Sequence, residues 1–391
     1  MNSSRLTETH QPVPVPLRGG AVATSDPAWD EFCVAVAEEL DAYFDGLKDT
    51  VRCSPGFPVL RSRIREQVTG GKLLRPRLTR LAWRAFDGRA ETVLDSEARN
   101  APDPECVRLA ASFELLHAAL LVHDDVVDRD PVRRGRPTVG ELYRRDAHSA
   151  GAPSDEAQHL GEAVAIIGGD LLLAGALRLA TTCTADPARL HAVSAVVFDA
   201  VTASAAGELD DVLLSMHRYG QQHPAVQDIL NMERLKTATY SFEAPLRAGA
   251  LLAGANQEDA ARLARAGSRI GVAYQVVDDV LGTFGDPRLT GKSTEADLRE
   301  GKATVLTAHG MQDARARKAL AGFAAGNVTV AQVKAALAQA GAETSAVKLA
   351  AELVADAQDA LERLPLPEAE RAELSAICHY VLHRRKYVTR L

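Results

Sequence analysis

The feature of this chain that most constrains its fold is a series of long apolar segments with helical spacing. From residue 28 onward, apolar side chains recur every three or four residues, as in LRPRLTRLAWRAF (74–86) and CVRLAASFELLHAALLVHDDVV (106–127). This spacing gathers the apolar side chains on one face of a helix. Leu and Ala dominate the segments, and aromatic residues make up only 5% of the chain. The sequence therefore predicts an all-α protein.

Three stretches rich in Gly, Pro and polar residues interrupt the helical pattern, at 87–105, 146–158 and 285–302. None of them is long and polar enough to separate two domains, so residues 27–391 are expected to form one domain. Residues 1–26 alternate proline with polar residues and lack the apolar core of a secretory signal. We therefore expect a disordered N-terminal arm.

The most membrane-like stretch is AVAIIGGDLLLAGALRLA (163–180), which is interrupted by two glycines and Asp170. It is interpreted as a core helix, and no transmembrane segment is expected.

The net charge of −7 argues against a nucleic-acid partner, because phosphate backbones attract basic surfaces. The five cysteines form no CxxC pair and are expected to be buried thiols of a cytoplasmic protein.

The strongest functional signal is an apolar helix that ends in three carboxylates, Asp124, Asp125 and Asp128. The first and last of these lie one turn apart and can bracket one ion. Oxygen ligands without a nearby thiolate suit Mg²⁺, which binds through a few carboxylates plus substrate phosphates. A DDxxD alone also occurs on solvated helix ends. Here Arg133 and Arg134 follow within a short loop, and their guanidinium groups match phosphate oxygens. The combination predicts a magnesium–diphosphate site.

A second apolar helix, in AYQVVDDVLGTFGD (273–286), carries Asp278 and Asp279, with Gln275 one turn before Asp278 on the same face. Two carboxylate-bearing helices that face each other across a cavity can hold a shared set of metal ions. Each basic residue in similar contexts is, by itself, typical of a solvated surface. Together they are enough to neutralise two diphosphates: Lys72, Arg75, Lys236, Lys292 and Lys302.

These motifs, in this order, resemble the trans-polyprenyl diphosphate synthases, which elongate isoprenoid chains head to tail. The resemblance extends over nearly the whole chain after the N-terminal arm. It is carried by GGKLLRP (70–76), LLHAALLVHDDVVDRDPVRRGRPTVG (115–140), GGDLLL (168–173), LKTATYSFEAP (235–245), YQVVDDVLGTFGD (274–286) and TGKSTEADLREGKATVL (290–306). The form of the second acidic motif is similar to that of actinobacterial geranylgeranyl diphosphate synthases.

The resemblance implies an isoprenoid synthase type I helical bundle around a central substrate cavity, assembled as a homodimer. It also implies Mg²⁺-dependent ionisation of an allylic diphosphate (dimethylallyl, geranyl or farnesyl), condensation with isopentenyl diphosphate, and loss of a proton. Three magnesium ions per active site are expected. The metal ligands implied are Asp124, Asp125, Asp128, Asp278 and Asp279. The residues implied to hold isopentenyl diphosphate are Lys72, Arg75, His117 and Arg134. Those implied to contact the allylic diphosphate are Arg133, Lys236, Lys292 and Lys302, with Thr237 and Gln275 near the cation that forms.

The chain departs from the family pattern at three positions. Gly282 stands where the second motif often has a third aspartate, so that ligand is expected to be missing. Leu73 stands where an arginine is common, which removes one phosphate contact. In GELDD (207–211), Glu208 replaces the usual glutamine. None of these changes removes the two acidic clusters.

The product's hydrocarbon tail is expected to extend from the metals toward the N-terminal half of the same helix. At a rise of about 1.5 Å per residue, Ala119 lies about 7.5 Å and Leu116 about 12 Å below Asp124. In the family, aromatic residues at the fourth and fifth positions before the motif stop growth at farnesyl diphosphate. These positions are Leu120 and Ala119 here. Leu116 and Phe113 are then the candidate stops, which favours geranylgeranyl diphosphate. A cavity left open by neighbouring helices favours hexa- to nonaprenyl products instead. The same stripe is also compatible with ordinary core packing.

Three other interpretations are weighed against this one. An HD-type phosphohydrolase uses a His–Asp pair such as that at 123–125, but it needs further histidines and does not explain the second acidic pair. Terpene cyclases share the acidic motif but do not need Lys72, Arg75 and His117 for a second diphosphate. An inactive partner subunit of a heteromeric synthase should have lost one acidic cluster, and this chain retains both.

Overall fold

The computed structural model describes residues 27–50, 53–68, 73–87, 101–216, 223–285 and 296–388. The expectation for residues 1–26 lies outside this range. The helices are α1 (Pro27–Thr50), α2 (Phe57–Val68), α3 (Leu74–Phe86), α5 (Pro104–Val127), α6 (Val139–Ser149), α7 (Ser154–Ala180), α8 (Pro187–Ser215), α9 (Val226–Glu233), η2 (Arg234–Glu243), α10 (Ala244–Ala253), α11 (Gln257–Phe284), α13 (Ala296–Glu300), α14 (Val305–Gly310), α15 (Ala314–Ala324), α16 (Val330–Gln339), α17 (Ala342–Glu362) and α18 (Glu368–Val388). The strands are β1 (Val132–Arg133) and β2 (Arg136–Pro137), which form one antiparallel hairpin. The all-α prediction is confirmed.

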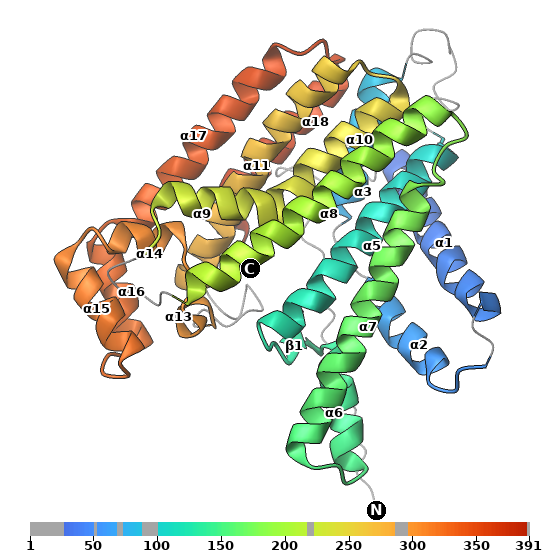
Figure 1. The fold of residues 1–391 in the computed structure, drawn as a ribbon. Helices are drawn as coiled ribbons and strands as arrows, with labels where there is room; N and C mark the ends of the chain where they lie inside the picture. Colours follow the sequence, from blue (N-terminus) through green and yellow to red (C-terminus); the bar gives the residue numbers. More distant parts are fainter. Residues whose placement is uncertain are drawn as a thin grey trace, which may run out of the picture.

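Helix α5 is the central element of the bundle. Asp103 caps it by accepting hydrogen bonds from the backbone N–H groups of residues 105 and 106, and Pro104 occupies its first turn, as both residues favour at a helix start. Its neighbour α7 runs antiparallel to it: His123 of α5 lies beside Asp170, whereas Glu105 contacts Thr184 just beyond the end of α7. In Figure 1, α5, α7 and α8 run side by side through the middle of the molecule.

Other helices surround this layer. Helix α3 packs on α10, and α11 packs on both η2 and α17. Helix α17 lies on the opposite side of the molecule from α1 and α2 (Figure 1), whereas α18 packs on α11, α17 and α3. The buried side chains form one continuous core that includes Phe113, Phe242 and Ile270.

The structure differs from the sequence prediction in two segments. The break predicted at 146–158 is much shorter, because α6 continues to Ser149 and α7 begins at Ser154. Gly151, at φ 93°, takes the left-handed conformation between them, which glycine adopts without steric cost. The segment ILNMERLKTATYSFEAPLRAGALLAG (229–254), whose apolar spacing also predicts one helix, is continuous, but its middle part, η2, is a π-helix. The prediction that the cysteines are buried is also wrong in part, since Cys53 is exposed.

Within the described part of the chain, three helices, α5, α7 and α8, are long and apolar enough to cross a membrane when judged by length and composition. In α5, 72% of the apolar 18-residue stretch is buried inside the protein. The buried share of the corresponding stretch falls to 44% in α7 and 33% in α8. The difference comes from exposed apolar side chains such as Ile167 on α7 and Phe198, Leu209 and Leu213 on α8. These two neighbouring helices therefore leave an apolar face uncovered in the single chain.

Candidate active site

The first acidic cluster lies at the C-terminal end of α5. Arg133, from β1, connects two of its members: Nη2 lies 2.7 Å from Oδ2 of Asp124, and Nε donates to Oδ1 of Asp125. Burial, which the charge of Arg133 only partly offsets, raises the pKa of Asp125 to about 7. Burial also acts on Asp124, but the charges of Lys236 and Arg133 outweigh it and lower the pKa of Asp124. Without metal, the neighbouring cations therefore favour the anionic form of Asp124, whereas Asp125 is buried against Arg133.

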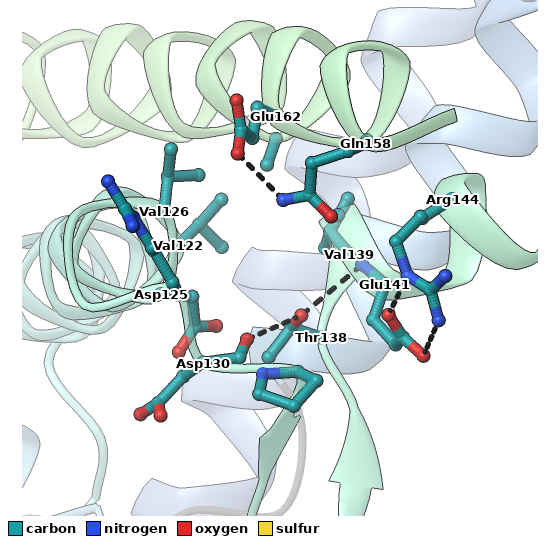
Figure 2. Close-up of a pocket in the computed structure, with 15 residues that line it drawn as sticks. Val122, Asp125, Val126, Asp130, Thr138, Val139, Glu141, Arg144, Gln158 and Glu162 are labelled. Carbon is teal, nitrogen blue, oxygen red and sulfur yellow. Dashed lines mark hydrogen bonds and ion pairs between the residues drawn. The ribbon is translucent and has the colours of Figure 1, made fainter. Parts of the chain in front are cut away.

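A tight hairpin positions the arginine pair. Arg134 and Gly135 both have positive φ, at 53° and 73°, as in the two-residue turns that match strand twist. Thr138 anchors the far side of the loop, because its hydroxyl donates to the carbonyl of Asp130 and accepts from the backbone N–H of Glu141. Figure 2 shows these bonds around a small pocket behind the first cluster, lined by α5, α6 and α7. The loop is therefore fixed at both ends, with Arg134 at its tip.

Lys236 of η2 reaches the same cluster. Its Nζ lies 2.6 Å from Asp211, 3.0 Å from Glu208 and 3.1 Å from Asp124. Close backbone packing makes this possible: a Cβ on Gly207 of α8 would lie 2.1 Å from the backbone nitrogen of Lys236. Burial by itself lowers the pKa of Lys236, but the carboxylates around it raise the pKa by more than burial lowers it. The net pKa lies above its usual value, so the ammonium stays charged.

The third carboxylate of the cluster, Asp128, pairs with a residue far along the chain. Nζ of Lys302 lies 2.5 Å from Oδ2 of Asp128 and 3.3 Å from Glu300. Burial raises the pKa of Asp128, and the charge of Lys302 opposes that effect. Each carboxylate of the first motif thus faces at least one cation.

The second acidic cluster has two members with different surroundings. Asp278 accepts from Nη2 of Arg384 on α18 at 2.7 Å. Asp279 is buried and accepts from Nε2 of Gln275 at 3.0 Å. Gln275 shares a helical face with both aspartates, at i+3 and i+4, and its amide is hydrogen-bonded to the second of them, Asp279. Burial raises the pKa of Asp279 to about 7, and its neighbour Glu233 also has a raised pKa because of burial and the nearby Asp279.

The two acidic clusters meet at one short segment. Asp279 of α11 lies near enough to Glu233 to raise its pKa, and Asp124 of α5 forms an ion pair with Lys236, only three residues after Glu233 along the chain. Helix η2 packs against both α5 and α11. The two carboxylate-bearing helices, α5 and α11, therefore pack against the same segment.

The missing aspartate at Gly282 has a structural counterpart. A Cβ placed on Gly282 would lie 2.7 Å from Oδ2 of Asp297 on α13. The carboxylate of Asp297 therefore occupies the space beside Gly282, and it contributes to the raised pKa of Asp279. The second cluster keeps a third carboxylate, which comes from another part of the chain.

A second cationic group lies about one turn further along η2, at Tyr240 and Ser241. Arg75 of α3 donates from Nη2 to Ser241 at 2.7 Å, stands over the ring of Tyr240 at 4.9 Å, and lies 4.0 Å from Glu114. Nδ1 of His117 lies 3.2 Å from the Tyr240 hydroxyl. Burial, followed by the charge of Arg75, lowers the pKa of His117 well below its usual value. His117 is thus a neutral hydrogen-bonding group and not a cation.

The structure places most of the predicted site residues around η2. Thr237 is half-buried next to Lys236. Lys72 and Lys292 lie outside the described residues. Several residues around the site were not assigned roles from the sequence: Glu114, Asp211, Glu233, Tyr240, Ser241, Asp297 and Arg384. Four of them, Asp211, Tyr240, Ser241 and Asp297, lie inside segments that resemble family motifs, so their positions carried a signal. Arg384, in a C-terminal segment without a motif, carried none.

The donor set fits a hard cation. Among the described residues, no group of three or more His, Cys, Asp or Glu side chains is arranged to hold an ion by itself. Mg²⁺ does not require such a cage, because it keeps several waters and binds through one or two carboxylates plus substrate phosphates. Asp124 and Asp128, one turn apart with partly exposed side chains, fit this mode of binding.

The fold and the site define the class: an all-helical bundle in which two carboxylate clusters and two cationic groups surround one π-helical segment. The sequence model of the family described as "Polyprenyl synthetase" matches residues 58–340. The chain belongs to this family of trans-prenyl diphosphate synthases.

Relatives within the family carry different product names. The chain is 34% identical over 323 residues to the geranylfarnesyl diphosphate synthase of Aeropyrum pernix, covering 81% of this chain and 91% of that protein. It is 31% identical over 324 residues to the (2E,6E)-farnesyl diphosphate synthase of Mycobacterium bovis, covering 81% and 80%. A geranylgeranyl pyrophosphate synthase from Corynebacterium glutamicum, solved with isoprenyl diphosphate and magnesium, matches with a TM-score of 0.81 at 29% identity, covering 91% of this chain and 99% of that one.

Proposed function

We propose that the protein condenses isopentenyl diphosphate with an allylic diphosphate to give a longer prenyl diphosphate. The supporting observation is a pair of groups about one turn apart along η2. At Lys236, carboxylates are interleaved with Arg133, Lys236 and Lys302. At Tyr240, Arg75 and His117 adjoin the ring and hydroxyl with no carboxylate of either acidic motif in contact. The first group suits a metal-bound diphosphate and the second suits a diphosphate held by direct contacts.

The allylic diphosphate is assigned to the first group. Asp124, Asp128 and Asp278, together with Asp125 and Asp279, would hold Mg²⁺, with three ions per site, and the metal would supply positive charge that stabilises the leaving diphosphate. Arg133, Lys236 and Lys302 add fixed positive charge around the same oxygens, which lowers the free energy of the ionising transition state. Lys292 is expected to join them. Thr237 and Gln275 lie near the carbon that becomes cationic.

Isopentenyl diphosphate is assigned to the second group, with Arg75, His117 and Arg134 as its contacts and Lys72 as a further expected one. Its double bond attacks the allylic cation, and a proton is then lost. His117 is not proposed as the base, because its lowered pKa and its hydrogen bond with Tyr240 favour a positioning role. The released diphosphate is the proposed acceptor of the proton.

Geranylgeranyl diphosphate is the proposed main product. Ala119 and Leu120 provide no aromatic barrier just below Asp124, whereas Phe113 and Leu116 are fully buried deeper along α5. Phe113 and Leu116 are proposed to end the tail cavity. Relatives named for farnesyl and geranylfarnesyl products show that length varies within the family, so hexa- to nonaprenyl products are the alternative if the cavity continues past these side chains.

The protein is further proposed to act as a cytoplasmic homodimer. The apolar face of α7 and α8, with Ile167, Phe198, Leu209 and Leu213 exposed, is the proposed dimer interface, because burying such a face between two copies removes it from water. An inactive subunit is disfavoured by the presence of both acidic clusters.

The test is incubation of the purified protein with Mg²⁺, isopentenyl diphosphate and each allylic primer in turn, followed by chromatography of the products. A geranylgeranyl product is expected. Absence of product with every primer, from folded protein, would reject the proposed activity, and a longer product would support the alternative. Light scattering should give the mass of two chains.

A further inference from the structure

Position 208 carries a carboxylate, Glu208, where the family motif that GELDD (207–211) resembles usually carries a glutamine. Glu208, on α8, lies with Oε2 3.0 Å from Nζ of Lys236. Its other oxygen, Oε1, is buried without a hydrogen-bond partner. Among the residues that the structure describes, Glu208 therefore forms an ion pair with Lys236 alone. That single contact compensates its negative charge.

The contact is not needed to hold the lysine in place. Asp211, one turn further along α8, accepts from the same ammonium at 2.6 Å. The backbone of Lys236 is fixed separately by its close packing on Gly207. A glutamine at position 208 can also accept a hydrogen bond through its carbonyl oxygen. The property that Glu208 adds is therefore negative charge.

This charge lies where an anion is expected to bind. With Asp211, Glu208 and Asp124 within 3.1 Å, one ammonium faces three carboxylates, and the group has a net negative charge when all three are ionised. A diphosphate that contacts Lys236 has to compete with Glu208 for the same ammonium and is repelled by it. The repulsion is substantial because the side chains are mostly shielded from water, where charges are screened less.

We propose that Glu208 is an affinity-determining residue that acts through Lys236, weakening the binding of the allylic diphosphate and of the released diphosphate. The inference rests on the proposed function, because it assigns Lys236 to the allylic diphosphate. Its consequence is selective: binding of isopentenyl diphosphate, assigned to Arg75 and His117 one turn further along η2, is unaffected, because Glu208 pairs with Lys236 whereas Arg75 pairs with Glu114 and His117 with Tyr240. A lower affinity for diphosphate also favours departure of the released diphosphate from the site after the reaction.

The matched variants are Glu208→Gln, which removes the charge but keeps the shape, and Glu208→Asp, which keeps the charge. Asp210→Asn is the control, because Asp210 is an exposed carboxylate on the same helix. For each protein, KM is measured separately for the allylic diphosphate and for isopentenyl diphosphate, and Ki is measured for inorganic diphosphate. Binding of magnesium diphosphate is measured directly by calorimetry, which needs no turnover.

For Glu208→Gln we expect the allylic KM, the Ki and the calorimetric Kd to fall by roughly three- to tenfold, a moderate effect for one partly buried charge. KM for isopentenyl diphosphate should stay the same, and Glu208→Asp and Asp210→Asn should behave as the wild type. Unchanged or higher allylic KM and Kd in Glu208→Gln would overturn the inference. If the wild type binds magnesium diphosphate but makes no product, the proposed function fails, while the calorimetric difference still tests the role of Glu208.

Discussion

The guanidinium of Arg384 lies 2.7 Å from the carboxylate of Asp278 and 3.8 Å from the ring centroid of Tyr274. The last helix of the bundle is thereby connected to the second acidic cluster across 106 residues. Tyr274 lies one turn before Asp278, and its ring contacts Phe242 of η2. Arg384 therefore joins α18, α11 and the centre of the site.

Replacing Arg384 with Gln should destabilise the metal-free protein. The change leaves Asp278 without its cation and removes the contact with Tyr274, at a cost of about 1–3 kcal/mol. Urea unfolding measures the difference. The control is Arg265→Gln, an exposed arginine on α11, for which a change below about 0.5 kcal/mol is expected. Equal stability of the two variants would contradict a role for the Arg384 contact.

Asp124→Asn should reduce turnover by about 100-fold or more, because the change removes the carboxylate that faces both Arg133 and Lys236. The fold should remain, since Lys236 keeps Asp211 and Glu208 as partners. Initial rates and thermal unfolding together check both statements. Asp199→Asn, an exposed site on α8, is the control. Near-normal activity of the Asp124 variant would contradict the assignment of Asp124 as a metal ligand.

Ala119→Phe should shorten the main product. Ala119 is fully buried, so the larger ring has to take space from the proposed tail cavity, and it should also destabilise the core by about 1–3 kcal/mol. Leu116→Ala should lengthen the product by removing a candidate stop. Chromatography of the products from one fixed primer tests both variants. If neither variant changes the product, a different wall of the cavity sets its length.

Gly207→Ala should damage both stability and turnover. The added Cβ would lie 2.1 Å from the backbone nitrogen of Lys236, so α8 and η2 have to separate, at a cost of about 1–3 kcal/mol or more. Gly46→Ala is the matched control, because a Cβ there meets nothing within 4 Å in an exposed part of α1. That change should be neutral or stabilise by about 0.5–1 kcal/mol. Unfolding and initial rates are measured for both, and similar results would argue against the close approach.

Glu141 should make stability depend on acidic pH. Hydrogen bonds from Arg144, with a further one from Arg145, lower the pKa of Glu141 to about 2. The unfolded chain therefore binds this proton more readily than the folded one, and stability falls as the pH falls. The advantage of the wild type over Glu141→Gln should be full at neutral pH and shrink between about pH 4.5 and 2, the interval between the unfolded and folded pKa. Urea unfolding at a series of pH values checks this, and a difference independent of pH would contradict it.

Much of the local structure could be predicted from the sequence. The segment 74–86 has the bounds of α3, and the helix predicted at 106–127 extends only two residues further toward its N-terminus. These helices follow from apolar spacing and from capping residues such as Asp103, which act over a few residues. The order of the motifs likewise indicated the family before any contact between them was known.

Side-chain partners could not be predicted in the same way. Gln275 and Asp278 share a helical face by spacing, yet Gln275 bonds to Asp279. Gly282 indicated a lost carboxylate, yet Asp297 fills the space beside it. In both cases, the outcome depends on which atoms of neighbouring helices occupy the available space.

The sequence by itself determined the helices, their caps and the carboxylate-tipped ends of α5 and α11, because these depend on interactions between residues a few positions apart. Only the tertiary structure decided that Lys236 lies among three acids, that Lys302 reaches Asp128, and that the C-terminal helix supplies Arg384. These contacts join residues up to 174 positions apart, and they form only when whole helices pack and small residues such as Gly207 let the backbones come close.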